Sequence, residues 1–482
     1  MNRLGGIEHQ KTPVRLNIAK VKVPLSAVLA AWVTGKAGSA VLWVVRHPRC
    51  LLPALLVAAV WVAWSRAGGF SLFGILAVVV CGLVLWRVLG RESFTTQVSW
   101  RARGVWRGSR VYRFTWQPAM VTTNLAVKVE SSEYLPRLVS VRSTGSVDQV
   151  RVRMLPGQTL EDYAVAAPRL AQTFDAIECR VRSVEGKRQE IVLWFLVADP
   201  LTTPVQPLAP SDAPDLTGLP VARREDGLTY RLKLLGSHLL VVGATGSGKG
   251  SVIWSIITGL GPAIRDGLAQ VWALDPKGGM ELAAGRRLFT RFVYGDPEDG
   301  VAFEFDFARV LEDAVSIMRR RQANLRGVTR LHPPTPAEPL IVVVVDELAS
   351  LTAYVTDRDA KKRISAALSL LLSQGRAVGV SVVGAVQDPR KDVIAMRDLF
   401  PTRIALRLSE PDQVALVLGT GARDRGARCD RISESLPGVG YVAIDGVAEP
   451  VRVRFTHVTD ADIDRLVATY TPGTRTAEGV AA

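Results

Sequence analysis

Cysteine is scarce in this sequence, and acidic residues are nearly missing from its first quarter. The four cysteines, Cys50, Cys81, Cys179 and Cys429, form no Cys-x-x-Cys pair and no metal-spaced cluster. This spacing excludes a zinc signature and a disulfide framework, and it favours reduced thiols in a cytosolic setting. No internal repeat is evident either.

The first 115 residues contain sixteen lysines and arginines but only two acidic residues, Glu8 and Glu92. The other 367 residues contain 44 basic and 43 acidic side chains, so almost all of the net charge of +15 lies near the N-terminus. Because this excess flanks an apolar stretch, we interpret it first as a signal for membrane topology and not as a nucleic-acid-binding surface.

The apolar stretch has two halves without any charge, 51–65 and 70–86. The second half reaches the lower length limit for crossing a bilayer, about 17 residues, and the first is slightly shorter. We therefore predict a transmembrane hairpin over residues 50–87, preceded by a basic cytoplasmic segment, 1–49. Arginines are concentrated on the outer flanks and only Arg66 lies between the halves, which predicts a multi-pass protein of the cell membrane with both termini cytoplasmic. A helical hairpin buried in a soluble domain is the alternative.

Beyond the hairpin the sequence changes character twice. Strand-like runs precede a segment with six prolines, and from about Val221 apolar runs alternate with helical patterns. Such runs, buried on both faces, are typical of a mostly parallel α/β sheet. They lie at 238–242, 270–274, 340–345, 380–386 and 403–408. We divide this part of the chain into a small α/β domain of unknown role at 88–198, a Pro-rich linker at 199–220, a second α/β domain at 221–458 and a C-terminal tail at 459–482.

A phosphate-binding loop is predicted in the stretch LLVVGATGSGKGS, Leu239–Ser251. A strand pattern ends at Val242, and the glycines that follow let backbone N–H groups approach phosphate oxygens closely. A helical pattern begins directly afterwards, so its N-terminus faces the anion. Lys249 is placed to reach the β- and γ-phosphates of ATP. The predicted nucleotide contacts are Gly243, Ala244, Thr245, Gly246, Ser247, Gly248, Lys249, Gly250 and Ser251.

This loop departs from the usual pattern at one position. The residue after the lysine is normally Ser or Thr, whose hydroxyl binds magnesium, but here it is Gly250. Either Ser251 takes over through a small shift, or Asp346 and water bind the Mg²⁺.

The second half of the predicted site is LIVVVVDELASL, Leu340–Leu351. Its apolar run predicts a buried strand that places Asp346 at the carboxyl end, where α/β sheets bind ligands. Asp346 suits magnesium binding. Glu347 is adjacent and suits the role of general base toward the attacking water. We therefore expect ATP and Mg²⁺ as cofactors.

Five motifs in a fixed order resemble the FtsK/SpoIIIE family of DNA translocases, and the similarity extends over about residues 225–455. They are HLLVVGATGSGKGSV, ALDPKGG, VVVVDELASL, GRAVGVSVVGAVQDP and PTRIALRLSEPDQV. The resemblance implies a RecA-like P-loop ATPase motor that forms a homo-hexamer and moves double-stranded DNA. In having a glycine after Lys249, the sequence also resembles transfer proteins of actinobacterial conjugative elements.

The resemblance implies roles for individual residues. Lys249 matches the phosphate lysine, Asp346 the magnesium aspartate and Glu347 the catalytic glutamate. Gln387 matches a glutamine that senses the γ-phosphate, although Asp388 follows it where the family usually has arginine.

Two arginines match candidates for a finger that completes the ATP site of a neighbouring subunit, namely Arg376 and Arg403. Asp275 and Lys277 match a DPK element for which the sequence suggests no role. The densest basic patch of the motor, Ser316–Arg330, is either a DNA track or an ordinary solvated surface.

The preferred hypothesis is a membrane-anchored, ATP-driven pump for double-stranded DNA that transfers a plasmid or integrative element between cells, with element-encoded accessory proteins as further partners. A chromosome-segregation DNA pump is the first alternative. A protein-secretion ATPase of the type VII kind is the second, although such chains usually contain several motor domains and only one phosphate loop occurs here.

Overall fold

The computed structural model describes residues 72–129, 132–295, 302–389 and 392–472. The chain divides into two compact units, 1–99 and 100–482. The described residues of the first unit form α3 (Leu72–Leu89), α4 (Arg91–Phe94) and the π-helical turn η2 (Thr95–Ser99).

The predicted transmembrane hairpin falls mainly outside the described residues, since its first half and its connection precede residue 72. Within the described ranges, no helix is both long and apolar enough to cross a membrane. The predicted segment 1–49 and the last ten residues of the tail also lie outside the described part of the chain.

The second unit begins with a small antiparallel sheet of four strands in the order β3-β4-β6-β5. Buried Val150, Leu193 and Phe195 lie in its core, which also includes apolar side chains of α6 and α7. The α7 helix begins with a capping box formed by Thr159 and Asp162. The elements of this part are α5 (Trp100–Arg107), η3 (Gly108–Tyr112), α6 (Arg113–Thr122), β1 (Val127–Val129), β2 (Ser132–Tyr134), β3 (Arg137–Ser143), β4 (Val147–Arg153), α7 (Leu160–Thr173), β5 (Glu178–Val184) and β6 (Lys187–Leu196).

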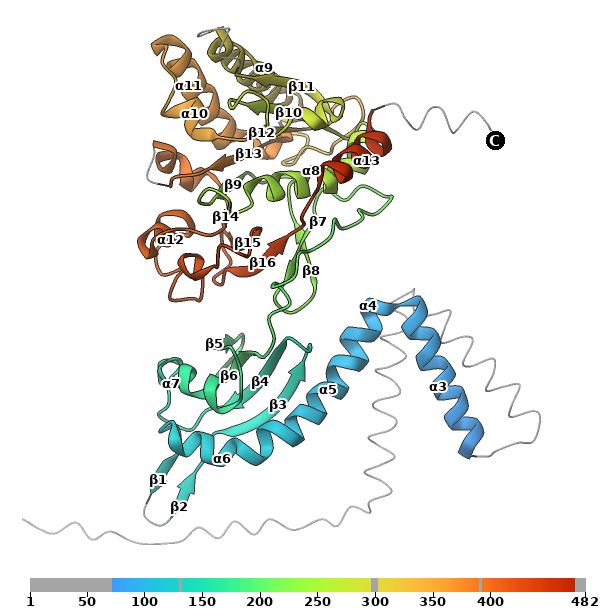
Figure 1. Ribbon diagram of the computed structural model, residues 1–482, viewed down its shortest axis with the longest axis vertical. Helices are drawn as coiled ribbons and strands as arrows, with labels where there is room; N and C mark the ends of the chain where they lie inside the picture. The colour runs from blue at the N-terminus through green and yellow to red at the C-terminus, as the bar shows by residue number, and fades with distance from the viewer. Residues whose placement is uncertain (1–71, 130–131, 296–301, 390–391, 473–482) are drawn as a thin grey trace, which may run out of the picture. The chain divides into compact units, whose positions relative to one another are not determined.

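The rest of the second unit is built on a sheet of ten strands in the order β11-β10-β12-β13-β9-β14-β15-β16-β7-β8. The first six are mutually parallel and the last four are antiparallel, which confirms the predicted α/β class with a mostly parallel sheet (Figure 1). All five apolar runs found in the sequence are strands of this sheet. The strands are β7 (Leu219–Arg224), β8 (Thr229–Leu232), β9 (Leu239–Val242), β10 (Ala269–Asp275), β11 (Phe289–Tyr294), β12 (Leu340–Val345), β13 (Val380–Val386), β14 (Thr402–Ala405), β15 (Val439–Ile444) and β16 (Val451–Phe455).

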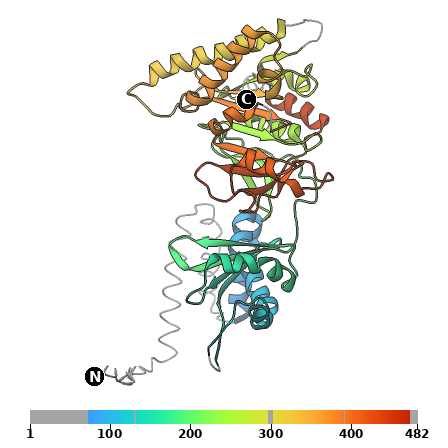
Figure 2. The same ribbon diagram turned by 90° about the vertical axis from the view of Figure 1, so that its left-hand side faces the viewer.

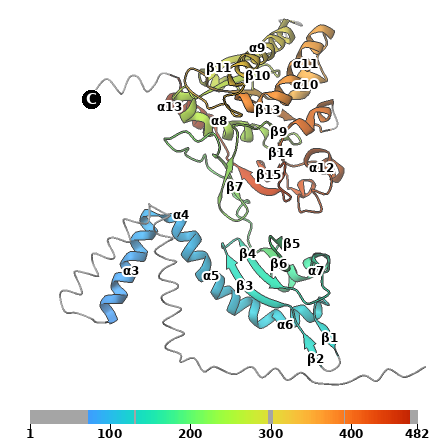
Figure 3. The same ribbon diagram turned by 180° about the vertical axis from the view of Figure 1, so that it is seen from behind.

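Helices cover both faces of the large sheet because its central strands are apolar on both faces. In β9, Leu240 and Val242 belong to one buried cluster, while Leu239 and Val241 belong to the other. The first cluster includes α9 (Ala302–Leu325), α10 (Leu348–Thr352), α11 (Arg358–Gln374) and α12 (Pro411–Leu418). The second includes α8 (Lys249–Arg265) and α13 (Asp460–Tyr470). Figure 2 shows α9 and α11 side by side, and Figure 3 shows α13 beside α8.

The Pro-rich segment 199–218 is attached to the large sheet. Val205 forms an isolated bridge with Thr456, and Arg454 donates hydrogen bonds to the carbonyls of Leu201 (2.8 Å) and Thr202 (2.9 Å). The segment forms no named helix or strand of its own before β7 begins, yet the hydrogen bonds from β16 and the bridge to Thr456 fix it to the large sheet.

The basic patch at Ser316–Arg330 separates into a buried arginine and four exposed ones. Arg319, Arg320, Arg326 and Arg330 are exposed on α9 and the turn that follows it. Arg321 is only 2% exposed and donates hydrogen bonds to the carbonyls of Val378 (3.1 Å), Gly379 (3.0 Å) and Pro339 (2.6 Å). Burial lowers the pKa of its guanidinium, and the carbonyl oxygens satisfy the buried charge.

We expect Arg321→Ala to lower the free energy of unfolding by roughly 2–4 kcal/mol, because it removes the donor to the buried carbonyl oxygens of Val378 and Pro339. The exposed neighbour provides the control, since Arg320→Ala is expected to change stability by less than about 0.5 kcal/mol. Urea unfolding of both variants and the wild-type chain measures the difference. Equal midpoints for the two variants would show that the Arg321 hydrogen bonds do not stabilise the fold.

Candidate nucleotide site

The predicted nucleotide residues come together because three parallel strands end at one edge of the sheet. β13 lies between β9 and β12, with Val386 opposite Val242 and Gly384 opposite Val345. The phosphate loop (residues 243–248) follows β9, the acidic pair Asp346 and Glu347 follows β12, and Gln387 follows β13. This edge is where open α/β sheets bind ligands.

The phosphate loop has the backbone that its glycines allow. Gly246 and Gly248 have positive φ angles of 72° and 95°, a conformation that favours glycine. The loop is also tied to the antiparallel half of the sheet, because the N–H of Gly438 donates to the carbonyl of Ser247 at 2.8 Å. A Cβ atom at Gly248 would lie 2.4 Å from that same nitrogen, so a larger residue there would displace the loop.

Lys249 is buried, and its ammonium lies in the phosphate loop. Its Nζ donates to the carbonyls of Gly243 at 2.8 Å and Ala244 at 3.3 Å. Burial lowers the pKa of Lys249, while the nearby carboxylate of Glu347 opposes this effect. A buried ammonium whose hydrogen-bond partners, among the described residues, are loop carbonyls is well placed to exchange them for phosphate oxygens.

Asp346 and Glu347 are both buried and share one cation. The Nζ atom of Lys277 lies 3.0 Å from Asp346 Oδ2 and 3.3 Å from Glu347 Oε2. Burial by itself would lower the pKa of Lys277, but the two carboxylates outweigh it and raise the pKa above its ordinary value. The space between these carboxylates therefore accepts a positive charge, and the residues present fit the magnesium ion that the family resemblance implies.

The Asp275 loop (residues 275–282) explains the DPK element. The carboxylate of Asp275 is fully buried and accepts hydrogen bonds of 3.1 Å from the backbone N–H groups of Lys277, Glu281 and Leu282. Asp275 thereby folds the loop, and the loop directs Lys277 toward Asp346 and Glu347. No pattern in the sequence indicates this role, because the partners of Asp275 are backbone groups.

Glu281 is a site residue that the sequence analysis missed. Its side chain reaches the first turn of α8, beside Gly250. Burial raises the pKa of Glu281, and the nearby carboxylates of Asp346 and Asp275 raise it further. The Glu281 carboxyl group therefore lies in the same cluster as Lys249 and Asp346.

Gln387 lies between the phosphate loop and Glu347. Its backbone N–H donates to Glu347 Oε1 at 3.4 Å, and its side-chain Oε1 accepts from the hydroxyl of Thr245 at 3.4 Å. A group that touches both the loop and the proposed general base is suitably placed to sense a phosphate between them.

The two candidate finger arginines lie away from this cluster. Arg376 is exposed in η6 (Arg376–Val378), which leads into the amino end of β13, the edge of the sheet opposite Lys249. Arg403 lies in β14 and forms an ion pair with Asp445 at 2.8 Å. The prediction that one of them acts on a neighbouring subunit stays a prediction.

A third arginine that the sequence analysis did not single out contacts the phosphate loop. Arg407 donates to the carbonyl of Thr245 at 2.9 Å and pairs with Glu434 at 3.0 Å. It follows β14, which lies beside β9 in the sheet, so its position near the end of the apolar run 403–408 was the available signal.

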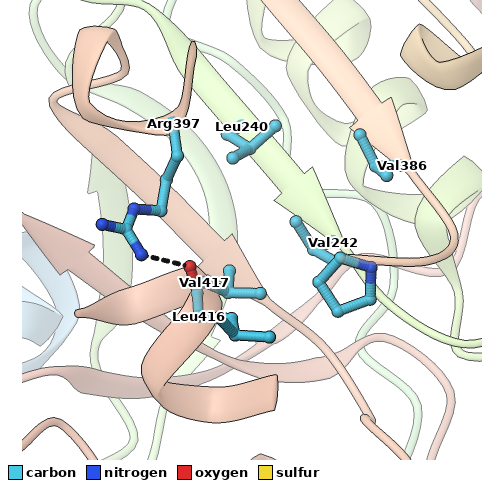
Figure 4. Close-up of a pocket in the computed structure, with 7 residues that line it drawn as sticks. Leu240, Val242, Val386, Arg397, Leu416 and Val417 are labelled. Atoms are coloured by element: carbon cyan, nitrogen blue, oxygen red, sulfur yellow. Dashed lines mark hydrogen bonds between the residues drawn. The ribbon is translucent and has the colours of Figure 1, made fainter. Parts of the chain in front are cut away.

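A small pocket lies beside the phosphate loop, on the side of the sheet that α12 covers (Figure 4). Arg397 donates to the carbonyl of Leu416 at 2.6 Å at its rim. The other lining residues are apolar, namely Leu240, Val242, Val386, Pro389, Leu416 and Val417. This lining does not suit a phosphate, and the pocket is separate from the polar cluster around Lys249.

The comparisons with known proteins agree with this geometry. Over 348 residues, 67% of this chain and 79% of the relative, the chain is 27% identical to the transfer protein TraSA of Streptomyces ambofaciens. Over 251 residues it is 28% identical to the DNA translocase FtsK of Lactiplantibacillus plantarum, which covers 48% of this chain and 29% of that protein. The chain thus spans less than a third of the length of such FtsK relatives.

Among solved structures, the pCW3 conjugation coupling protein TcpA in its monomer form with ATPgS is similar, with a TM-score of 0.47 and 19% identity. The match covers 74% of this chain and 98% of that one. Residues 79–194 match the actinomycete conjugal transfer protein N-terminal domain, and residues 211–433 match the FtsK/SpoIIIE family. The site described above is that of an ATPase, and it lies within the residues that match the FtsK/SpoIIIE family.

Proposed function

We propose that this chain is an ATP-driven translocase of double-stranded DNA that acts in conjugative transfer between cells. The observation behind the proposal is the convergence of Lys249, Asp346, Glu347 and Gln387 at one sheet edge, in a domain of the FtsK/SpoIIIE family. The relatives support the choice of substrate, because one is named a transfer protein and others are named DNA translocases.

In this proposal each residue has a task in ATP hydrolysis. Lys249 exchanges the carbonyls of Gly243 and Ala244 for phosphate oxygens. Glu347 accepts a proton from the attacking water, and Gln387 connects the Glu347 carboxylate to the phosphate loop. A magnesium ion held by Asp346 would neutralise the negative charge on the phosphates.

The proposal includes a homo-hexamer around the DNA, in which Arg376 or Arg403 completes the ATP site of the next subunit. A ring of this kind grips DNA mainly through its phosphates, for which exposed arginines are suited. The four exposed arginines at the end of α9 are the candidates, namely Arg319, Arg320, Arg326 and Arg330.

The proposal also places the chain in the cell membrane, with the motor and both termini in the cytoplasm. Two uncharged apolar runs, 51–65 and 70–86, and the arginines on their outer flanks support this placement. We expect the full chain to sediment with membranes and a variant that begins at residue 199 to stay in the supernatant. Full chain that remains in the supernatant after lysis would contradict the membrane anchor.

Duplex DNA should stimulate ATP hydrolysis by the purified chain, and the stimulation should fall steeply as salt rises from about 50 to 200 mM. Steady-state phosphate release with and without random-sequence duplex DNA measures this effect. A rate that does not respond to duplex DNA at any salt concentration would exclude the translocase and favour a motor for another substrate.

Glu347→Gln should bind ATP with nearly unchanged affinity but hydrolyse it about 10²–10⁴-fold more slowly, because it removes a general base. Lys249→Ala should lose ATP binding, since no other ammonium lies in the phosphate loop. The exposed Glu161 provides a matched control, because Glu161→Gln removes the same charge from a helix of the small sheet. Hydrolysis by Glu347→Gln at the control rate would refute the assignment of Glu347.

A further inference from the structure

We propose that Glu281 replaces the hydroxyl that is missing at Gly250 and binds magnesium together with Asp346. This inference rests on the proposed ATP-driven function and names a further residue of its nucleotide site. The starting observation is that the position after Lys249, where this loop normally has Ser or Thr, is a glycine.

The space of the missing side chain is filled by Glu281. A Cβ atom built on Gly250 would lie 2.0 Å from Glu281 Oε1, 2.9 Å from Cδ and 3.4 Å from Oε2. The carboxylate therefore occupies the place where the side chain of Ser or Thr would begin. An oxygen atom is present at this point of the site after all, but it comes from another segment of the chain.

The backbone does not account for the glycine. Gly250 lies within α8 and is not among the glycines with positive φ, in contrast to Gly246 and Gly248. Many residues could adopt its conformation, and the atoms that a side chain at Gly250 would meet belong to the carboxyl group of Glu281. The glycine and the glutamate fit together as a pair.

The Asp275 loop fixes the backbone of Glu281. The N–H groups of Glu281 and Leu282 both donate to Asp275 Oδ2, and the side chain of Leu282 is fully buried. The same loop directs the ammonium of Lys277 to Asp346 and Glu347. The ammonium of Lys277 therefore already lies at ion-pair distance from Asp346, which is one of the two proposed magnesium ligands.

The chemistry of the donors suits magnesium. Mg²⁺ in nucleotide sites is usually bound by one or two carboxylates together with phosphate oxygens and water. Asp346 and Glu281 supply two carboxylates beside the phosphate loop, and Lys249 marks where the phosphates bind.

Ser251 is the other candidate for magnesium binding, but its place in α8 directs its side chain elsewhere. Successive residues of an α-helix are rotated by about 100° around its axis, so Ser251 does not project where a side chain at Gly250 would. The carbonyl of Ser251 accepts the hydroxyl of Ser255 within α8, as expected for a residue in a regular helical turn.

The test is magnesium-dependent nucleotide binding by the full chain, without hydrolysis. Binding of a fluorescent, non-hydrolysable ATP analogue is titrated with MgCl₂ and repeated in EDTA. Glu281→Gln keeps the size of the side chain but removes its charge. We expect it to raise the magnesium concentration for half-saturation by at least about tenfold and to leave binding in EDTA unchanged. Glu161→Gln, which removes the same charge from the exposed face of α7, is the matched control and should leave both unchanged, while Ser251→Ala tests the rival residue.

A second variant tests the exchange directly. In Gly250→Ser combined with Glu281→Ala, the carboxylate no longer fills the space and a hydroxyl is restored after Lys249. We expect this double variant to require less magnesium than Glu281→Ala alone, with half-saturation close to that of the wild type. Its success would also show that loss of binding in Glu281→Ala is not loss of fold.

Two results would overturn the proposal. Half-saturation at the wild-type magnesium concentration in Glu281→Gln would remove Glu281 from the site, and a rise in Ser251→Ala instead would assign the task to Ser251. If the wild-type chain bound no nucleotide in magnesium or in EDTA, the proposed function itself would fail, and this inference with it.

Discussion

The order and parallel direction of β9, β13 and β12 are the constraint on which the rest of the motor depends. Because β13 lies between the other two, residues from three distant stretches of chain end at one edge. These strands are apolar on both faces, so the hydrophobic pattern by itself would not fix their register. Polar contacts do so: the backbone N–H of Val382 donates to His238 Nδ1 at 3.0 Å, and Ser381 donates to the carbonyl of Leu234 at 3.1 Å. Burial, and then Arg376, lower the pKa of His238 to about 3, so the ring is neutral and can accept.

Two of the buried charges that backbone groups satisfy, Arg321 and Asp275, have different consequences for the structure. Arg321 donates to three carbonyls and joins α9 to the segments that flank β12 and β13. Asp275 accepts from three N–H groups and shapes the loop that brings Lys277 and Glu281 to the nucleotide site. Since a buried charge without partners is costly, each contact set specifies one local conformation. The contacts of Arg321 stabilise the fold, and those of Asp275 position side chains of the nucleotide site.

Much of the fold and half of the site could be predicted from local sequence. The strands β9, β12 and β13 were visible as apolar runs, and their ends placed Lys249, Asp346, Glu347 and Gln387. The antiparallel strands β7, β8, β15 and β16 were not identified, because alternating or short runs give a weaker pattern than continuous ones.

The sequence by itself determined the phosphate loop and the acidic pair, because each is a contiguous motif whose geometry follows from its own glycines, strand and helix. Only the tertiary structure decided the roles of Arg321, Lys277, Glu281 and Arg407. In the sequence Arg321 does not differ from its exposed neighbours, and only the packing of α9 buries it. Lys277 pairs with Asp346, which lies 69 residues further along the chain. Such contacts depend on which strands become neighbours and on which face of a helix is covered. Hydrophobic burial over the whole domain determines the strand neighbours and the covered helix faces. Local sequence patterns do not predict either of them.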